Sequence, residues 1–311
     1  MSRAFLFPGQ GAQTIGMGRD LAEAYPAARI VFEEVDEALG EKLSAVIWDG
    51  DIETLTLTAN AQPALMATSI AAIRALEAEG ITVMQASYVA GHSLGEYSAL
   101  TAAGALSVTD AARLLRARGA AMQDAVPVGQ GAMAAILGLG LEEVRKVAEA
   151  ASQGEVCAAA NDNDPAQVVV SGHKAAVERA VDLAREAGAK RAMLLPVSAP
   201  FHCALMAPAA EAMENALADV DIRAPSVPVV ANVLAEAVSE PDRIRSLLAD
   251  QITGAVRWRE SVAWMVEQGV DDFWEIGAGK ALIGMVRRID RSVATRAVGT
   301  ATDVKAASEN G

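Results

Sequence analysis

The segment Gly91–Gly95 (GHSLG) most constrains how this chain can fold. It follows a short apolar run at 87–90 that predicts a buried strand, and it precedes small residues that predict a helix from about 94 to 103. A G-x-S-x-G sequence between a strand and a helix is typical of a strained turn that exposes a serine hydroxyl at the carboxyl end of the strand. Glycine and serine are also common in ordinary turns, so the motif alone leaves both interpretations open.

Strands and helices alternate on both sides of this turn. The sequence is 52% apolar but only 4% aromatic, which suits the close packing of helices on a sheet. We therefore predict an α/β fold whose large domain is a parallel-sheet, α/β-hydrolase-like unit. Thr109 or Asp110 is expected to cap one helix, and the small polar tail from Ala301 is expected to be frayed. Strands are predicted at 3–7, 227–231, 272–276 and 294–298, and helices near 19–39, 62–79, 110–123, 203–218, 240–251, 256–268 and 280–290.

In the middle of the chain, the predicted strands and helices follow a different order. They follow the order β-α-β-β-α-β, which is the order of a ferredoxin-like unit. The strands are expected at 132–138, 156–160, 167–171 and 190–195, and the helices at 141–152 and 173–187. We expect an inserted ferredoxin-like small domain at 128–196 and a catalytic α/β domain formed by 1–127 and 197–311.

Charge and cysteine content exclude several classes of function. The formal net charge of −14 argues against a nucleic-acid partner, which would need clustered Lys and Arg. The apolar start of the chain ends at Pro8, too early for a signal peptide, and no apolar run is long enough to cross a membrane. Cys157 and Cys203 fit neither a metal-ligand spacing nor a disulfide framework. We expect a cytoplasmic protein without metal.

The chain has three histidines that could activate Ser93. His92 adjoins the serine, so its side chain is expected to leave the turn in another direction and to shape it. His173 begins a helix of the insert, where a capping or surface role is expected. His202 remains by elimination, and the dipole of the helix that follows it favours the neutral imidazole that can accept a proton. A histidine at a helix start is also an ordinary terminus residue, but the presence of Ser93 favours a base.

Further motifs occur in a fixed order from one end of the chain to the other. They are Phe7–Gln13 (FPGQGAQ), Gln62–Ala64, Gly91–Tyr97 (GHSLGEY), Arg118 with Met122, Asn161 and Asn163, Ser198–Met206 (SAPFHCALM), Gln251, and Gly277–Lys280. With this set the sequence resembles malonyl-CoA:acyl carrier protein transacylases over nearly its whole length. Phe201 stands where some members have Ser, and in related polyketide acyltransferase domains a Phe there accompanies a preference for malonyl over methylmalonyl groups.

The resemblance implies a catalytic dyad without an obligatory carboxylate. Ser93 would be the nucleophile and His202 its base, with a backbone carbonyl near Gln251 orienting the imidazole. The backbone N–H groups of Gln10 and Leu94 would form the oxyanion hole.

The resemblance also assigns substrate binding to Arg118, which would hold the free carboxylate of the malonyl group. A guanidinium offers a planar fork that matches a carboxylate and keeps its charge when buried. The alternative is that Arg118 lies on an exposed helix face with Arg113 and Arg116. Those two share a face, however, and Arg118 points elsewhere on the helix. The other substrate-binding residues implied are Met122, Asn163 and Phe201.

The implied reaction is ping-pong transfer of malonyl from malonyl-CoA to the phosphopantetheine thiol of acyl carrier protein, in fatty acid biosynthesis. The intermediate is O-malonyl-Ser93, and no cofactor is needed because the coenzyme A thioester is a substrate. One alternative is a serine thioesterase or hydrolase; another is a polyketide-pathway malonyltransferase. Nucleotide binding at Gly9–Gly11 fails because Thr14 stands where the dinucleotide fingerprint needs Gly. A hydrolase triad would take its acid from Asp124, Asp162, Asp164 or Asp182.

Overall fold

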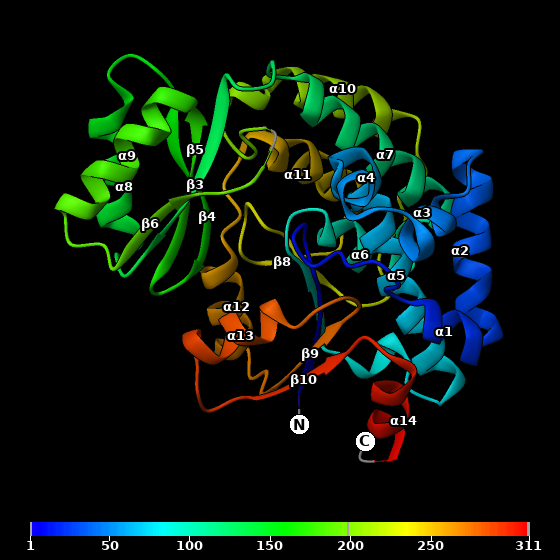
Figure 1. Ribbon diagram of the computed structural model, residues 1–311. Coiled ribbons are helices and arrows are strands. Elements are labelled where there is room, and N and C mark those ends of the chain that lie inside the picture. Colours follow the sequence, from blue (N-terminus) through cyan, green and yellow to red (C-terminus); the bar gives the residue numbers. More distant parts are fainter. Residues whose placement is uncertain (1, 198, 310–311) are drawn as a thin grey trace.

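The computed structural model describes residues 2–197 and 199–309 and contains two β-sheets (Figure 1). In these residues the larger sheet has the strand order β10-β9-β1-β2-β7-β8. Its neighbouring strands are parallel except β8, which runs antiparallel to β7 and was not predicted. The predicted α/β class with a parallel sheet is confirmed. The strands are β1 (Arg3–Phe7), β2 (Tyr88–Gly91), β7 (Val229–Val230), β8 (Ala237–Val238), β9 (Asp272–Ile276) and β10 (Ala294–Val298).

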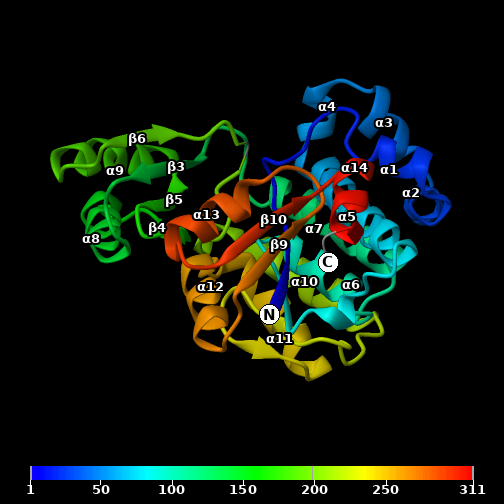
Figure 2. The ribbon, with the colours of Figure 1, turned by 90° about the horizontal axis from the view of Figure 1, so that it is seen from below.

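Helices cover both faces of this sheet (Figure 2). Side chains alternate along β1, so that Phe5 and Phe7 join one apolar cluster while Ala4 and Leu6 join another on the opposite face. The first cluster includes residues of α2, α5, α7, α10 and α11, and the second includes residues of α12 and α13. The helices of this part are α1 (Arg19–Ala24), α2 (Pro26–Leu39), α3 (Leu43–Asp49), α4 (Ile52–Thr56), α5 (Thr58–Ala78), α6 (Gly95–Ala102), α7 (Val108–Asp124), α10 (Ala207–Ala218), α11 (Pro241–Thr253), α12 (Trp258–Glu267), α13 (Ala281–Ile289) and α14 (Ala301–Glu309).

The structure differs from the predicted helices at several points: α3 and α4 were not predicted, α5 begins at Thr58, and α10 begins at Ala207. Three further differences have a clear local cause. The segment 19–39 forms two helices because Tyr25 is extended and Pro26 starts α2, where its fixed φ and missing N–H are tolerated. Ser107 caps α7, because its side chain accepts the N–H of Asp110. The tail is not frayed: it forms α14, which packs against α5 with Val304 and Ala307 buried.

The smaller sheet is antiparallel, with the strand order β4-β5-β3-β6. Two helices pack on one of its faces and complete the predicted order β-α-β-β-α-β. The elements are β3 (Gly131–Leu137), α8 (Leu141–Ser152), β4 (Cys157–Asp164), β5 (Gln167–His173), α9 (Lys174–Glu186) and β6 (Arg191–Leu194). They fall within the predicted insert, whose limits at 128 and 196 remain a prediction.

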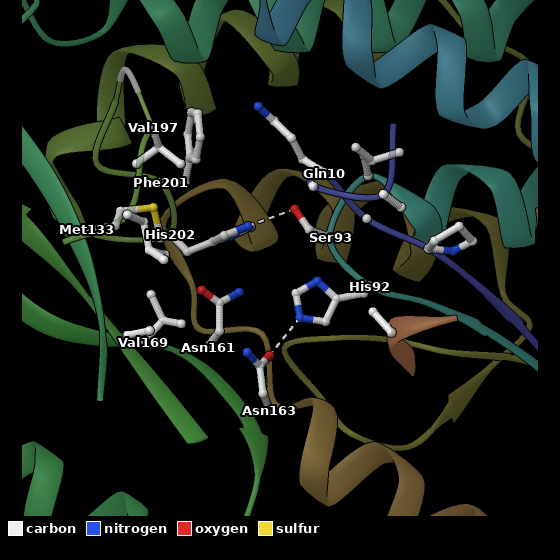
Figure 3. A pocket seen from close by; sticks show the side chains of 18 of the residues that line it. Gln10, His92, Ser93, Met133, Asn161, Asn163, Val169, Val197, Phe201 and His202 are labelled. Carbon is white, nitrogen blue, oxygen red and sulfur yellow. Dashed lines mark hydrogen bonds between the residues drawn. The ribbon is translucent and has the colours of Figure 1, made fainter. Parts of the chain in front are cut away.

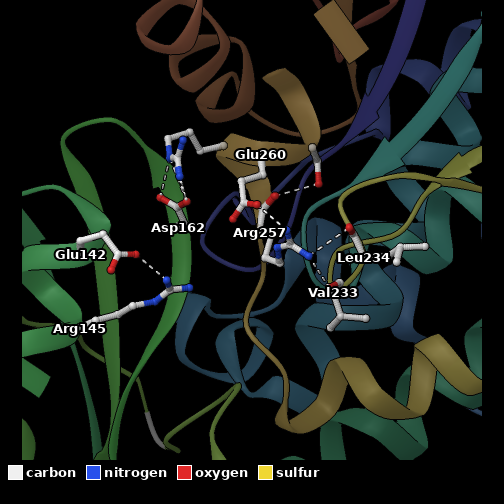
Figure 4. Close-up of polar contacts among 9 residues, drawn as sticks. Glu142, Arg145, Asp162, Val233, Leu234, Arg257 and Glu260 are labelled. Carbon is white, nitrogen blue, oxygen red and sulfur yellow. Dashed lines mark hydrogen bonds and ion pairs between the residues drawn. The ribbon is translucent and has the colours of Figure 1, made fainter. Parts of the chain in front are cut away.

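Strand β4 connects the two parts of the molecule. It is longer than predicted and continues to Asp164. Its residue Asn161 forms a parallel bridge with Val256, which lies just before α12. In addition, Asp162 forms an ion pair of 2.8 Å with Arg259 of α12 (Figure 4), and Asp164 forms one of 2.7 Å with Arg288 of α13. Backbone pairing and buried carboxylates therefore hold the smaller sheet against α12 and α13.

Candidate active site

The turn after β2 has the strained geometry that the sequence predicts. Ser93 lies in the left-handed region with φ of 54°. A Cβ on Gly91 would lie 1.9 Å from the carbonyl of Gly95, and a Cβ on Gly95 would lie 2.2 Å from the carbonyl oxygen of Phe7. Both positions therefore need glycine. The turn presents the Ser93 hydroxyl at the carboxyl end of β2.

Asn232 holds this turn from the end of the neighbouring strand β7. Its Oδ1 accepts the N–H of Ser93 at 2.7 Å, and its Nδ2 donates to the carbonyl of Gly91 at 2.7 Å. Arg257 fixes the loop that carries Asn232: its N–H donates to the Asn232 carbonyl, and its guanidinium donates to the carbonyls of Val233 and Leu234 (Figure 4). Sequence reasoning missed Asn232, because it lies in no motif.

His202 lies beside Ser93, as predicted by eliminating the other two histidines as the base (Figure 3). Its Nε2 is 2.7 Å from Ser93 Oγ, and its Nδ1 is 2.8 Å from the backbone carbonyl of Gln251. Because a carbonyl can only accept, Nδ1 carries the proton and Nε2 is free to accept the proton of the Ser93 hydroxyl. Burial, with a smaller contribution from the charge of Arg118, lowers the pKa of His202 to about 3. The imidazole is therefore neutral at physiological pH.

We expect the His202 imidazole to stay neutral from about pH 8 to about pH 5 in the folded protein. The pKa of His202 lies below its ordinary value of 6.5, so the folded state favours the neutral imidazole, whereas the unfolded chain binds a proton below pH 6.5. The free energy of unfolding should then fall as pH decreases below 6.5, by up to about 1.4 kcal/mol per pH unit. Nitrogen NMR titration of the histidine side chains measures the pKa of His202, and the His202→Ala variant identifies its resonance. A midpoint near 6.5 for native His202 would contradict the burial argument.

Among the described residues, the side chains of the other two histidines hydrogen-bond to groups other than Ser93. His92 is half-buried and points toward Asn163, whose Oδ1 lies 2.9 Å from His92 Nε2 (Figure 3), and its ring packs against Trp258. It thus links the serine turn to β4. His173 stands at the N-cap position of α9 but makes no capping bond; its Nδ1 accepts the N–H of Val156 at 2.9 Å instead. Of the capping and surface roles predicted for His173, the capping role was wrong.

None of the four candidate aspartates reaches His202, whose Nδ1 faces a backbone carbonyl instead. Asp124 is exposed, and the other three form ion pairs with arginines. The pairs are Asp162 with Arg259, Asp164 with Arg288 and Asp182 with Arg185. A Ser-Asp-His triad built on these residues is therefore excluded.

Arg118 is buried beside Ser93, with 1% of its surface exposed. Its Nη1 donates to Gln62 Oε1 at 2.8 Å, and its Nη2 donates to Gln251 Oε1 at 2.8 Å and to Ser93 Oγ at 3.1 Å. Among the described residues its Nε has no hydrogen-bond partner and no carboxylate forms an ion pair with it. A buried cation held only by neutral groups is suited to bind an anion. As predicted, Arg118 faces inward, whereas Arg113 is exposed.

Ser93, His202 and Arg118 line a cavity of about 560 Å³ between the two sheets. Gln10 and Leu94 lie at its wall, and across the described part of the chain neither backbone N–H donates to a protein carbonyl. Both are free to stabilise an oxyanion. The remaining predicted substrate-binding residues also line the cavity, namely Met122, Asn163 and Phe201. Ser198, the first residue of the predicted histidine motif, lies outside the described residues.

In 2–197 and 199–309, no group of three or more His, Cys, Asp or Glu side chains is placed to hold a metal ion. Over the same ranges, no helix has the length and apolar character needed to cross a membrane.

Comparison with known proteins identifies clear relatives. A model of the acyl transferase domain family matches residues 4–306. The chain is 50% identical over 296 residues to malonyl CoA-acyl carrier protein transacylase of Bacillus subtilis (strain 168), covering 95% of this chain and 92% of that protein. The crystal structure of acyl-carrier-protein-S-malonyltransferase from Bartonella henselae matches with a TM-score of 0.97 and 56% identity, over 100% of this chain and 99% of that one. A structure of a type II polyketide synthase acyl-carrier protein in complex with its malonyl-transacylase contains a chain that matches with a TM-score of 0.97 and 42% identity, over 100% of both.

Proposed function

The chain belongs to the acyl transferase domain family, and from this membership and the site around Ser93 we propose that it transfers malonyl from malonyl-CoA to acyl carrier protein. It is an acyltransferase. The relatives at 50% and 56% identity are named as a malonyl transacylase and a malonyltransferase, and one matching structure holds a carrier protein bound to its malonyl-transacylase. The observation that carries the choice of acyl group is the buried Arg118, whose Nη2 lies 3.1 Å from Ser93 Oγ.

The first half of the reaction forms an ester on Ser93. His202 Nε2 takes the hydroxyl proton while Ser93 Oγ attacks the thioester carbonyl of malonyl-CoA. The negative oxygen of the tetrahedral intermediate accepts hydrogen bonds from the N–H groups of Gln10 and Leu94. The C–S bond then breaks, and the imidazolium returns the proton to the departing sulfur. Coenzyme A leaves as the thiol, and O-malonyl-Ser93 remains.

The second half repeats these steps with another thiol. His202 takes the proton of the phosphopantetheine thiol of acyl carrier protein, whose sulfur attacks the ester carbonyl. The same oxyanion hole stabilises the second intermediate, and the proton returns to Ser93 Oγ. The backbone carbonyl of Gln251 keeps His202 in one tautomer throughout, so that Nε2 faces the serine in both halves.

Arg118 selects the acyl group by its carboxylate. We expect Arg118→Ala to lower kcat/KM for malonyl-CoA by about two orders of magnitude or more, because a buried charge-assisted pair is lost. The kcat/KM for acetyl-CoA should change much less, so the preference shifts toward the uncharged group. Steady-state rates with the two thioesters measure this. Arg113→Ala, on the exposed face of α7, is the matched control. A malonyl preference that survives in Arg118→Ala would show that the carboxylate is held elsewhere.

Hydrolysis is the alternative fate of the malonyl ester. A serine thioesterase with the same dyad would give free malonate, whereas the proposed transferase gives malonyl-acyl carrier protein. Incubation with malonyl-CoA and holo-acyl carrier protein, followed by separation of these two products, distinguishes them. We expect the carrier-bound product to dominate. Malonate as the main product in the presence of excess carrier would overturn the proposal.

We also propose a fatty-acid setting, a cytoplasmic location and a reaction without a resident cofactor. Free thiols at Cys157 and Cys203 suit a reducing compartment. Nucleophile, base, oxyanion donors and carboxylate ligand are each assigned to protein groups, so the reaction scheme has no step left for a cofactor. The matching polyketide complex makes a polyketide malonyltransferase the second candidate. Comparing the rates with fatty-acid and polyketide carrier proteins separates the two.

A further inference from the structure

Glu96 is a buried carboxylate that the reaction scheme does not use. It lies in the first turn of α6, three residues after Ser93, and 3% of its surface is exposed. A single oxygen, Oε2, accepts two hydrogen bonds: one from the backbone N–H of Asn232 at 3.0 Å and one from Gln251 Nε2 at 2.8 Å. A buried carboxylate is costly, so its retention next to the site calls for a reason.

The side chain of Gln251 connects Glu96 to Arg118. Its Nε2 donates to Glu96 Oε2 and, at 3.1 Å, to the carbonyl of Ser93, while its Oε1 accepts Nη2 of Arg118 at 2.8 Å. Rotating this amide by half a turn would place an NH₂ group against a guanidinium and an oxygen against two acceptors. The network therefore allows only one orientation of the amide. The oxygen of Glu96 is one of the two acceptors that set it.

We propose that Glu96 is a positioning residue for recognition of the malonyl carboxylate: acting through the Gln251 side chain, it holds the Arg118 guanidinium beside Ser93. This inference rests on the proposed function. A carboxylate in direct contact with Arg118 would occupy the donors that the substrate needs. An amide placed between the two fixes the guanidinium without neutralising it.

The role depends on where the oxygen lies and not on its charge. Burial raises the pKa of Glu96 to about 7, against the hydrogen bonds from Asn232 and Gln251 that favour the charged form. A protonated carboxyl still offers an acceptor oxygen to both donors, and so does the amide of glutamine. Aspartate, in contrast, keeps the charge but withdraws the oxygen by one methylene.

Two conservative variants separate position from charge. In Glu96→Gln we expect the ratio of kcat/KM for malonyl-CoA to kcat/KM for acetyl-CoA to stay within about threefold of the wild-type ratio. In Glu96→Asp we expect it to fall about tenfold or more, because Gln251 Nε2 keeps only the Ser93 carbonyl as an acceptor and the amide no longer fixes Arg118. Both rates are measured on one preparation, so the ratio does not depend on the fraction of folded enzyme. Disturbance of the Ser93 turn affects both substrates and cancels in the same way.

A third variant tests the connection itself. Gln251→Ala removes the amide but keeps the backbone carbonyl that holds His202, and we expect the same fall in the ratio as in Glu96→Asp. A wild-type ratio in Glu96→Asp or in Gln251→Ala would overturn the inference. So would a fall in Glu96→Gln as large as in Glu96→Asp, since charge would then be the cause. Failure of the proposed function is distinct, because the wild-type enzyme itself would then show no preference for malonyl-CoA.

Discussion

Replacing His202 with alanine is expected to lower kcat/KM for malonyl transfer by about three orders of magnitude or more, in line with the loss of the base in serine enzymes. Without the imidazole, the Ser93 hydroxyl must lose its proton to water, and the departing sulfur finds no proton donor. Steady-state transfer from malonyl-CoA to holo-acyl carrier protein measures the effect. The residual rate of the variant should rise with pH, because hydroxide takes over the role of the base.

His173→Ala is the matched control for this loss. His173 lies in the smaller sheet, where it bonds to the backbone of Val156 and contacts no residue of the dyad. Its replacement should leave kcat/KM within about threefold of wild type, because the variant keeps every group assigned to the transition state. A loss below tenfold in His202→Ala would mean that another group activates Ser93.

Ser93→Ala is expected to abolish both the acyl-enzyme and transfer to the carrier protein. The ester of the ping-pong scheme can form only on the Ser93 oxygen, so the variant has no covalent route. Intact-protein mass spectrometry after brief exposure to malonyl-CoA detects the adduct in the wild-type enzyme. The oxyanion donors and Arg118 remain in the variant, so binding of malonyl-CoA should persist.

Ser98→Ala is the control on the same helix. Ser98 is buried in α6, and its Oγ has no hydrogen-bond partner among the described residues, so its loss should cost little stability. The adduct should form in Ser98→Ala as in wild type. An adduct of the same size in Ser93→Ala would mean that another residue is the nucleophile.

Much of the fold could be predicted from local patterns. Strands such as β9 and helices such as α8 have clear periodicity and clear ends, and their limits in the structure match the predicted ones. The helix α14 could not be predicted in this way, because its stability comes from tertiary packing. Val304 and Ala307 are buried, and Thr300 and Asp303 bond to each other at the helix start. A small polar segment gives no such signal by itself.

The residues of the site that lie in sequence motifs could be predicted. Three histidines and one strained serine left a single pairing, and the helical position of Arg118 indicated an inward side chain. The resemblance also indicated the Gln251 carbonyl that holds His202, but two other supporting contacts could not be found, because they arise between distant segments. Asn232 meets the serine turn from β7, and the Gln251 side chain meets Glu96 from α11. Nothing in the sequence near either residue indicates its partner.

The central claim is that Ser93 carries the malonyl group between two thiols. The direct test is a pulse of labelled malonyl-CoA without carrier protein, followed by peptide mapping, and then a chase with holo-acyl carrier protein. We predict that the label lies on Ser93 after the pulse and moves to the phosphopantetheine thiol during the chase. Label on any other residue, or label on Ser93 that the chase releases as malonate, would contradict the claim.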